Sequence, residues 1–262
     1  MPNRYHDLYI ERGSGPAVVC SHGTLMDATQ FAPQLDYLSD RYRAISYNSR
    51  VLTGAPEPHS LADLVEDCRS LLDQLDIRKC VLAGMSVGGF MALQFALTYQ
   101  DRLDGLILID ATAQSYTPEE QEAYHHEFGK LDIDGMLPRA FAEWAASYCF
   151  GKTAYTANKP LVDYWTKRWT TTVPARAVLY QARSWINKDD LTSRLGEIKV
   201  PVLIIHGEED VPVPIERAIP MLDMLPNATL CRIPRAGHTS NLENEQAVNE
   251  AIGEFLASTY GG

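Results

Sequence analysis

The run Cys80-Val-Leu-Ala-Gly84-Met85-Ser86-Val87-Gly88-Gly89-Phe90 places a Gly-x-Ser-x-Gly pattern between an apolar, strand-like stretch and the start of a helix-like one. A turn sharp enough to lift a serine hydroxyl above a sheet strains its backbone, and flanking glycines let the strand and helix approach each other. Ser86 would then lie at a helix N-terminus, where the helix dipole favours a developing negative charge. The pattern predicts a nucleophilic serine, with a glycine-rich structural turn as the alternative.

Short runs rich in Val, Ile and Leu recur on both sides of this stretch, at residues 17–20, 44–47, 80–83, 106–109, 202–205 and 229–233. Segments with helical spacing lie between several of them. Residues 61–75 carry an apolar stripe behind a cap formed by Ser60 and Asp63, and residues 247–256 carry a second stripe. Runs too continuous for half-exposed strands, alternating with amphipathic helices, predict an α/β fold with a mostly parallel sheet flanked by helices.

The chain has 262 residues, of which 45% are hydrophobic and 22% charged, a balance typical of a soluble globular protein. We expect a single domain over residues 1–262. The alternation of strands and helices stops over residues 113–190, where helical patches occur without a clear strand. This stretch is predicted to form a helical cap, or lid, inserted in the domain.

A serine needs a base and an orienting acid to become a strong nucleophile. His238 follows the apolar run 229–233, so it is predicted to lie on a loop at the same sheet edge as Ser86. Two acids are candidates. Asp210 follows the run 202–205 and gives the chain order Ser, Asp, His, whereas Asp110 ends the run after the serine's helix. We favour Asp210 as the residue that holds the His238 imidazole, with Asp110 as the alternative.

The sequence Ser21-His22-Gly23-Thr24-Leu25 follows the first strong strand. Backbone N–H groups at such a His-Gly pair can point into the space above the serine. The amides of Thr24 and Val87 are therefore predicted to form an oxyanion hole, with Leu25 as an alternative to Thr24. His22 is expected to support the loop.

Aromatic residues gather in the predicted cap: residues 113–190 hold 13 of the 24 and all four tryptophans, although this stretch is less than a third of the chain. Most of these rings are expected to pack the cap against the core, and several to line an apolar pocket above Ser86. We name Leu25, Trp144 and Trp165 as candidate substrate-binding residues.

Charge and targeting signals exclude some partners. Lys and Arg total 23 against 34 for Asp and Glu, a formal net charge of −11, which opposes binding to nucleic acid or to an anionic membrane. The N-terminus lacks the apolar core of a signal peptide, and no apolar run is long enough to span a bilayer, so we expect a cytoplasmic protein. The five scattered cysteines are read as reduced packing residues. The oligomeric state is not addressed by these patterns.

Four ordered motifs, His22-Gly23, the turn 84–88, Gly207-x-x-Asp210 and Gly237-His238, together resemble the α/β-hydrolase fold family. Within it, the stretch 237–243 is most similar to the 3-oxoadipate enol-lactonase-like and small serine carboxylesterase group. The resemblance implies ester or lactone hydrolysis through an acyl-enzyme, with no metal and no organic cofactor. Members with an aspartate nucleophile are disfavoured because Ser86 fills that place.

One loop departs from the family. Relatives carry an Asp-x-Arg-Gly-His-Gly-like loop after the second core strand, whereas this chain reads Tyr47-Asn48-Ser49-Arg50-Val51-Leu52-Thr53-Gly54. Only Arg50 persists, so the substrate class of the enol-lactonases does not transfer directly.

The sequence therefore predicts a serine hydrolase acting on a small-molecule carboxylic ester or lactone through Ser86, His238 and Asp210. Two alternatives keep the triad: cleavage of a carbon-carbon bond, and the peracid chemistry of cofactor-free haloperoxidases. An alternative of another class is a slow-turnover ligand receptor or signalling protein, because some proteins of this fold act in that way.

Overall fold

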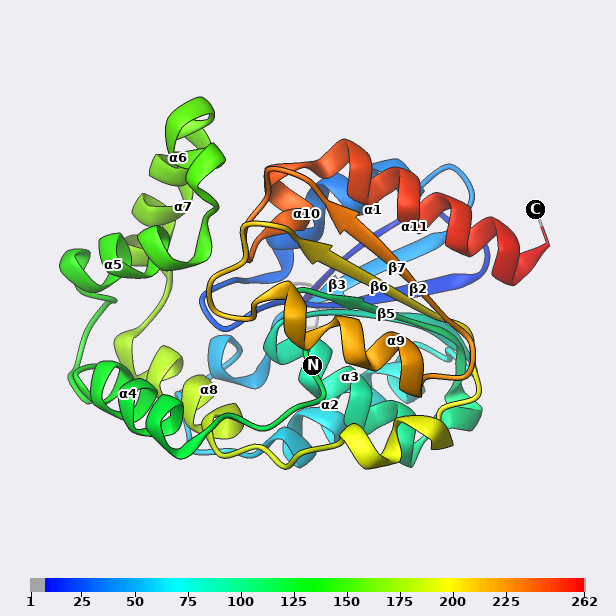
Figure 1. Cartoon of the computed structure of the whole chain (residues 1–262), viewed down its shortest axis with the longest axis horizontal. Coiled ribbons are helices and arrows are strands. Elements are labelled where there is room, and N and C mark those ends of the chain that lie inside the picture. Colours follow the sequence, from blue (N-terminus) through cyan, green and yellow to red (C-terminus); the bar gives the residue numbers. More distant parts are fainter. Residues whose placement is uncertain (1–7, 262) are drawn as a thin grey trace, which may run out of the picture.

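The computed structural model describes residues 8–261 and centres on a seven-stranded sheet with the order β1-β3-β2-β4-β5-β6-β7 (Figure 1). β1 pairs with β3 in the antiparallel sense, and the other pairings of the sheet are parallel. The predicted α/β class with a mostly parallel sheet is confirmed. The strands are β1 (Tyr9–Arg12), β2 (Ala17–Ser21), β3 (Arg43–Tyr47), β4 (Cys80–Met85), β5 (Leu103–Ile109), β6 (Val202–Gly207) and β7 (Ala228–Ile233).

Helices connect these strands and cover both faces of the sheet. Short 3-10 turns occur at Ala28–Phe31, Arg50–Leu52, Gln100–Arg102, Thr192–Glu197 and Ile215–Arg217. The α-helices are α1 (Ala32–Leu38), α2 (Leu61–Gln74), α3 (Val87–Thr98), α4 (Pro118–Gly129), α5 (Arg139–Cys149), α6 (Lys152–Ala157), α7 (Lys159–Thr172), α8 (Ala175–Ile186), α9 (Ile219–Met224), α10 (Ser240–Glu243) and α11 (Glu245–Tyr260).

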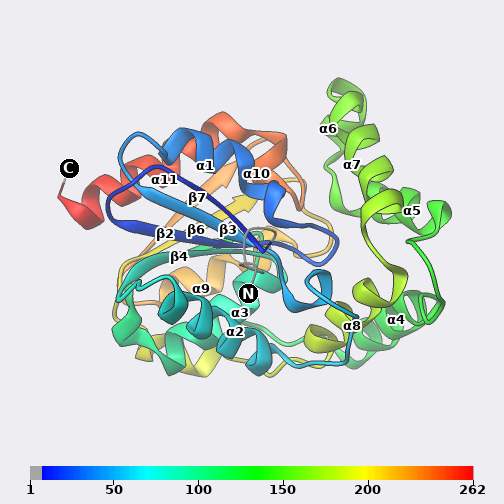
Figure 2. The same ribbon diagram turned by 180° about the vertical axis from the view of Figure 1, so that it is seen from behind.

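Alternation along each strand divides the core into two layers, because successive side chains of a strand point to opposite faces. Val19 and Leu82 pack with α2 and α3 on one face, whereas Val18, Val81 and Ala83 pack with α1 and α11 on the other. Figures 1 and 2 show α1 and α11 on one side of the sheet and α2, α3 and α9 on the opposite side.

The predicted strand and helix runs match observed elements. The six apolar runs fall in β2 to β7, and the two helical stripes form α2 and α11. The Ser60 hydroxyl accepts the Asp63 amide while the Asp63 carboxylate accepts the Ser60 amide, so both close a capping box at the start of α2. The edge strand β1 escaped prediction because it has four residues, includes Glu11 and Arg12, and is not fully buried.

The chain between β5 and β6 holds α4 to α8, and we call this part the α4–α8 segment. Figures 1 and 2 show it at the end of the sheet toward which the arrowheads of the parallel strands point. Within the described residues its β structure is limited to an isolated bridge between Met136 and Pro174. The division into a single domain over 1–262 with a cap at 113–190 stays a prediction.

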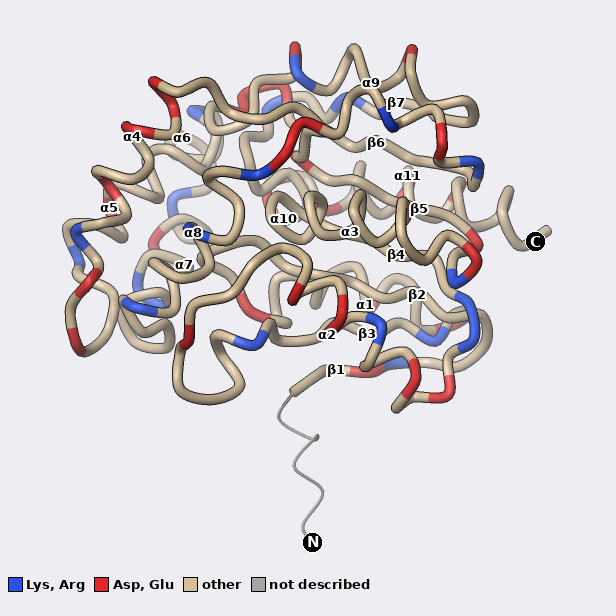
Figure 3. Tube along the Cα trace, turned by 90° about the horizontal axis from the view of Figure 1, so that it is seen from below, with Lys and Arg blue, Asp and Glu red and all other residues tan. Residues whose placement is uncertain are grey.

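The structure adds two facts on thiols and charge. The five cysteines are free thiols, and Cys20, Cys68 and Cys80 are buried. Figure 3 shows basic and acidic positions interspersed along the trace. Across residues 8–261, the helices fall short of the length and apolarity needed to cross a membrane. The predictions on nucleic acid, membrane and compartment stay predictions.

Candidate active site

Ser86 occupies a strained turn between β4 and α3. Its φ of 52° lies in a region that non-glycine residues rarely adopt. A side chain at Gly84 would collide with the Gly88 carbonyl oxygen at 2.2 Å, and one at Gly88 with the Ser21 carbonyl oxygen at 2.2 Å. The two glycines are therefore required by close backbone approach, which agrees with the steric reasoning from the sequence.

Ser86, His238 and Asp210 form a continuous chain of buried hydrogen bonds. Ser86 Oγ lies 2.9 Å from His238 Nε2, and His238 Nδ1 lies 2.8 Å from Asp210 Oδ2. The other oxygen of Asp210 accepts the Val213 amide at 2.9 Å, which fixes the carboxylate. The structure thus brings together the three residues named from the sequence. In this geometry His238 Nδ1 donates to Asp210, and Nε2 is placed to take the proton of Ser86.

Electrostatics in this buried chain favour a charged pair. Burial alone would lower the pKa of His238, but the Asp210 carboxylate outweighs it, so the pKa of the imidazole lies above its ordinary value. Burial would raise the pKa of Asp210, but the imidazoles of His238 and His206 outweigh it and hold the pKa below its ordinary range. An imidazolium that formed during a proton transfer would therefore be stabilised.

Asp110, the alternative acid, is engaged elsewhere. It accepts the Gly207 amide at 2.8 Å, the Ser240 amide at 3.0 Å and the Ser240 hydroxyl at 2.7 Å. These bonds tie the ends of β5 and β6 to the loop that carries His238. Burial, followed by repulsion from Asp210, raises the pKa of Asp110. The geometry therefore favours Asp210 as the partner of His238 and gives Asp110 a structural position.

His206 lies between the two acids, and the metal-ligating atoms of Asp110, His206 and Asp210 all lie within 4.8 Å of one another. Three such groups could hold a metal ion. Their carboxylate oxygens, however, already accept backbone and side-chain donors, and His206 Nε2 lies 2.7 Å from the Val213 carbonyl oxygen. A metal would have to replace these bonds, so we assign none.

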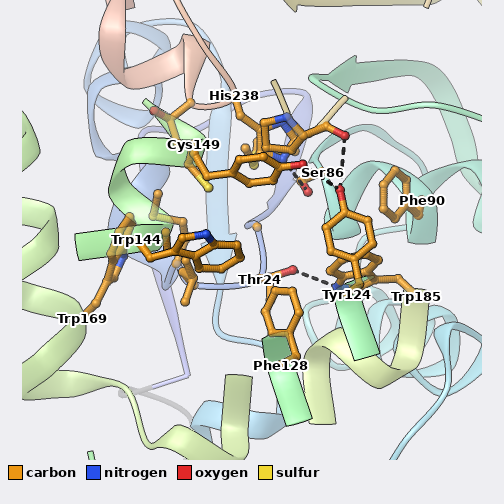
Figure 4. Close-up of a pocket in the computed structure, with 18 of the residues that line it drawn as sticks. Thr24, Ser86, Phe90, Tyr124, Phe128, Trp144, Cys149, Trp169, Trp185 and His238 are labelled. Carbon is orange, nitrogen blue, oxygen red and sulfur yellow. Dashed lines mark hydrogen bonds between the residues drawn. The ribbon is translucent and has the colours of Figure 1, made fainter. Parts of the chain in front are cut away.

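The loop after β2 carries Thr24 over the serine. His22 Nδ1 donates to the Gly23 carbonyl at 2.8 Å and Nε2 accepts the Ser49 amide at 3.0 Å, so His22 supports this loop. Trp185 Nε1 donates to Thr24 Oγ1 at 3.0 Å, as Figure 4 shows. Val87 is the first residue of α3, where backbone N–H groups lack a partner within the helix. The oxyanion-hole role of Thr24 and Val87 stays a prediction.

A cavity lies above Ser86 and His238, between the sheet edge and the α4–α8 segment. Figure 4 shows Phe90, Phe128 and Trp144 on different sides of this space. Leu25 and Trp144, named from the sequence, both line it. Most of its wall is aromatic, and the rings come from α3, α4, α5, α7, α8 and the chain before α4: Phe90, Tyr116, Tyr124, Phe128, Trp144, Tyr148, Trp169 and Trp185.

Trp165 corrects one expectation, because it does not line this cavity. Its ring contacts Tyr164 at 5.6 Å and lies 5.8 Å from the Arg168 guanidinium. Trp169, one helical turn later on α7, takes the place instead and packs on Phe150 with ring centroids 6.0 Å apart. One turn moves a side chain about 5.4 Å along the helix axis, which is enough to decide which of two buried rings reaches the space.

The loop 47–54, which departs from the family pattern, does not line the cavity above Ser86. Ser49 and Arg50 line a second, more polar cavity together with His22 and Gln181. Arg50 binds the Asp67 carboxylate with bonds of 2.6 and 2.7 Å, which ties the loop to α2. The loop therefore reaches the site only through His22.

Glu243, which sequence reasoning missed, fastens the His238 loop to the α4–α8 segment. Its carboxylate accepts the Gly151 amide at 2.8 Å, the Gly237 amide at 3.0 Å and both the amide and hydroxyl of Thr239. The His238 amide also donates to the Cys149 carbonyl at 2.7 Å. Cys149 and Gly151 belong to the α4–α8 segment, so the backbone of His238 is held by it from one side.

Comparison with known proteins agrees with this arrangement. The alpha/beta hydrolase fold family matches residues 16–245. Among curated relatives, a Caulobacter sp. strain K31 protein whose name is given as carbamate hydrolase RutD is 26% identical over 262 residues, covering 95% of this chain and 96% of its own.

Solved structures are similar as well. A thermophilic esterase from Thermogutta terrifontis matches with a TM-score of 0.89 and 27% identity, covering 96% of this chain and 93% of its own. The enol-lactonase from Burkholderia xenovorans LB400 matches with a TM-score of 0.86 and 24% identity over 95% of both chains, a likeness of fold. With the matched region spanning most of its length, the chain belongs to the α/β hydrolase fold family.

Proposed function

We propose that this hydrolase cleaves a small carboxylic ester or lactone through an acyl-enzyme formed on Ser86. The observation that carries the proposal is the buried chain from Ser86 Oγ to His238 to Asp210, with bonds of 2.9 and 2.8 Å, opening on an apolar cavity. A serine, a base and an orienting acid in this order form the arrangement of acyl-transfer enzymes.

The proposed reaction has two halves. His238 Nε2 takes the Ser86 proton as Oγ bonds to the substrate carbonyl carbon, and the amides of Thr24 and Val87 hold the resulting oxyanion. The oxyanion collapses, and the alcohol leaves with the proton from His238. Water then gives a proton to His238 and attacks the acyl carbon, and the acid departs as Ser86 Oγ regains its proton. Asp210 holds the imidazole tautomer throughout.

Two features favour an ester or lactone over the carbamate in the names of the curated relatives. The esterase from Thermogutta terrifontis shares 27% identity and a TM-score of 0.89 with this chain. The wall of the cavity is mostly aromatic, and apolar walls suit the hydrocarbon part of an ester. Carbon-carbon hydrolysis and peracid formation would use the same residues, so identification of the products belongs to the test.

The test is a substrate panel of p-nitrophenyl esters, simple lactones and alkyl carbamates, with products identified by mass spectrometry. We expect turnover of the esters or lactones, with release of the free acid. Preferential cleavage of carbamates, or tight ligand binding with no turnover of any member, would contradict the proposal. The second of these results would favour the receptor alternative.

The pH dependence of kcat/KM should report His238. Because the Asp210 carboxylate raises the pKa of this imidazole above the ordinary 6.5, we expect the acid limb of the profile to lie above 6.5. Below that pKa the imidazolium cannot accept the Ser86 proton, so activity rises with pH through it. Initial rates with p-nitrophenyl butyrate from about pH 5 to about pH 9 measure the limb. A limb at or below 6.5 would show that His238 is not the base.

Replacement of Glu243 by Gln should lower kcat more than it changes KM. The carboxylate takes four donors from Gly151, Gly237 and Thr239, and an amide group would present its own N–H atoms to some of them. We expect a loss of about 10- to 100-fold in kcat, since hydrogen bonds to a charged group contribute about 1.5–3 kcal/mol. Glu250→Gln, at an exposed position on α11, is the control. An unchanged kcat would show that this junction does not position His238.

A further inference from the structure

We infer that the cavity above Ser86 accepts an uncharged, compact, apolar acyl group and excludes an acyl group that carries a second carboxylate. This inference rests on the proposed function, because it assigns acyl specificity to the same site. It also separates this chain from any relative whose substrate is an anion.

The wall of the cavity offers no charged partner. Of the described residues that line it, none is Asp, Glu, Lys or Arg. Rings such as Phe128, Trp144 and Trp169 surround the space instead. A carboxylate that entered would lose its hydration without gaining an opposite charge, which is costly in an apolar site. An alkyl or aryl group would lose no such hydration.

The polar groups at the wall are neutral and partly engaged. Thr24 Oγ1 accepts the Trp185 N–H at 3.0 Å. The Tyr124 hydroxyl lies 3.5 Å from both the Tyr148 hydroxyl and the Pro212 carbonyl oxygen. Hydroxyl groups of this kind can meet an uncharged ester oxygen, but they supply no positive charge to a carboxylate.

Two cations lie near the cavity without lining it. Lys188 Nζ is 4.7 Å from the centre of the Phe90 ring and donates to the Gln114 carbonyl, and burial lowers its pKa to about 8. The Arg217 guanidinium is 5.3 Å from the centre of the Tyr116 ring and binds Glu120. Both cations contact rings of the wall, and neither can pair directly with an acyl group inside it. Lys188 is thus the residue through which an anion preference would have to act.

The size of the space limits the acyl group as well. The region that the centre of a water-sized sphere can occupy is about 60 Å³. A water molecule needs about 10–15 Å³ on this measure, so the space holds on the order of five such spheres. Long acyl chains would have to displace aromatic side chains, whereas a compact group fits the space as it stands.

The experiment compares three esters that differ at the far end of the acyl chain: p-nitrophenyl hexanoate, mono-p-nitrophenyl adipate and the matching adipamate ester. They end in a methyl, a carboxylate and an uncharged amide, so the third separates charge from size. We expect kcat/KM for the adipate to be at least about 100-fold below that for the hexanoate, because an unpaired buried charge is strongly disfavoured. We expect the adipamate to exceed the adipate at least about tenfold.

Variants test the wall and the cation behind it. Trp144→Arg should raise the adipate-to-hexanoate ratio at least about tenfold by supplying a charge partner, and Trp144→Leu should not. Lys188→Met should leave the wild-type ratio unchanged. The inference is overturned if the adipate reacts within tenfold of the hexanoate, if adipate and adipamate react equally, or if the ratio depends on Lys188.

The failure of this inference is distinguishable from failure of the proposed function. If the specificity is wrong, both the hexanoate and the adipate are hydrolysed at similar rates, and both activities disappear in Ser86→Ala. If the function is wrong, neither ester is turned over by a Ser86-dependent reaction. The comparison of substrates on the unaltered chain requires no variant to fold.

Discussion

Ser86→Ala is expected to lower kcat for p-nitrophenyl hexanoate by about 10⁴- to 10⁶-fold while leaving the fold intact, since loss of a triad nucleophile has effects of this size. Ser86 Oγ bonds to His238 Nε2, and its side chain is one oxygen larger than alanine. The substitution removes the atom that attacks the carbonyl and leaves the oxyanion donors and the cavity in place. Stopped-flow and long-time assays bracket the expected range of rates.

The control for this variant is Ser258→Ala, which removes a hydroxyl from an exposed position on α11. It should keep wild-type kcat and KM. Circular dichroism and thermal melting of both variants check that the fold is retained. Wild-type ester hydrolysis by Ser86→Ala would show that another group attacks the substrate and would remove the basis of the proposed function.

Asp210→Asn is expected to lower kcat by about 10⁴-fold, because an amide cannot hold the His238 tautomer or stabilise an imidazolium. The Asp210 carboxylate lies 2.8 Å from His238 Nδ1 and is the group that raises the pKa of His238. The variant should therefore also move the acid limb of kcat/KM to lower pH. Steady-state kinetics across pH measure both effects.

Asp110→Asn is the matched comparison, since it removes one buried carboxylate from the same cluster. Asp110 bonds to Gly207 and Ser240 rather than to His238, so we expect a loss of stability with a smaller loss of kcat, about tenfold or less. A larger loss of kcat in Asp110→Asn than in Asp210→Asn would make Asp110 the orienting acid.

Sequence reasoning reached the residues whose positions follow from strand ends. Ser86, Asp210 and His238 each follow an apolar run, and the carboxyl ends of parallel strands lie at one edge of a sheet, so their proximity was predictable. The glycines at 84 and 88 were readable for a similar reason, because a sharp strand-to-helix turn leaves no room for a side chain.

The cavity wall was not predictable to the same degree. Trp165 and Trp169 lie on one helical face and are both buried, so spacing alone could not tell which ring reaches the cavity. That choice depends on how α7 packs against its neighbours. Trp185 was visible only as one of several aromatic residues, and its bond to Thr24 joins positions 161 residues apart.

Glu243 shows a second limit of sequence reasoning. It lies in the stretch 237–243, yet its partners are mainly backbone N–H groups, which every residue except proline carries. Its nearest signal was the acid four residues after Thr239, a spacing that also occurs in many solvent-exposed helices. The edge strand β1 was missed because Tyr9–Arg12 is short and lacks an apolar run.

The most direct test of the account is covalent labelling by a fluorophosphonate, which reacts with an activated serine and is not released as an acyl group would be. The probe is mixed with the unaltered chain, and intact mass and peptide mapping locate the phosphonyl group. We predict one group per chain, on Ser86, with loss of ester hydrolysis in proportion to labelling and no labelling of Ser86→Ala. Labelling at another residue, or full labelling of Ser86 with hydrolysis retained, would contradict the account.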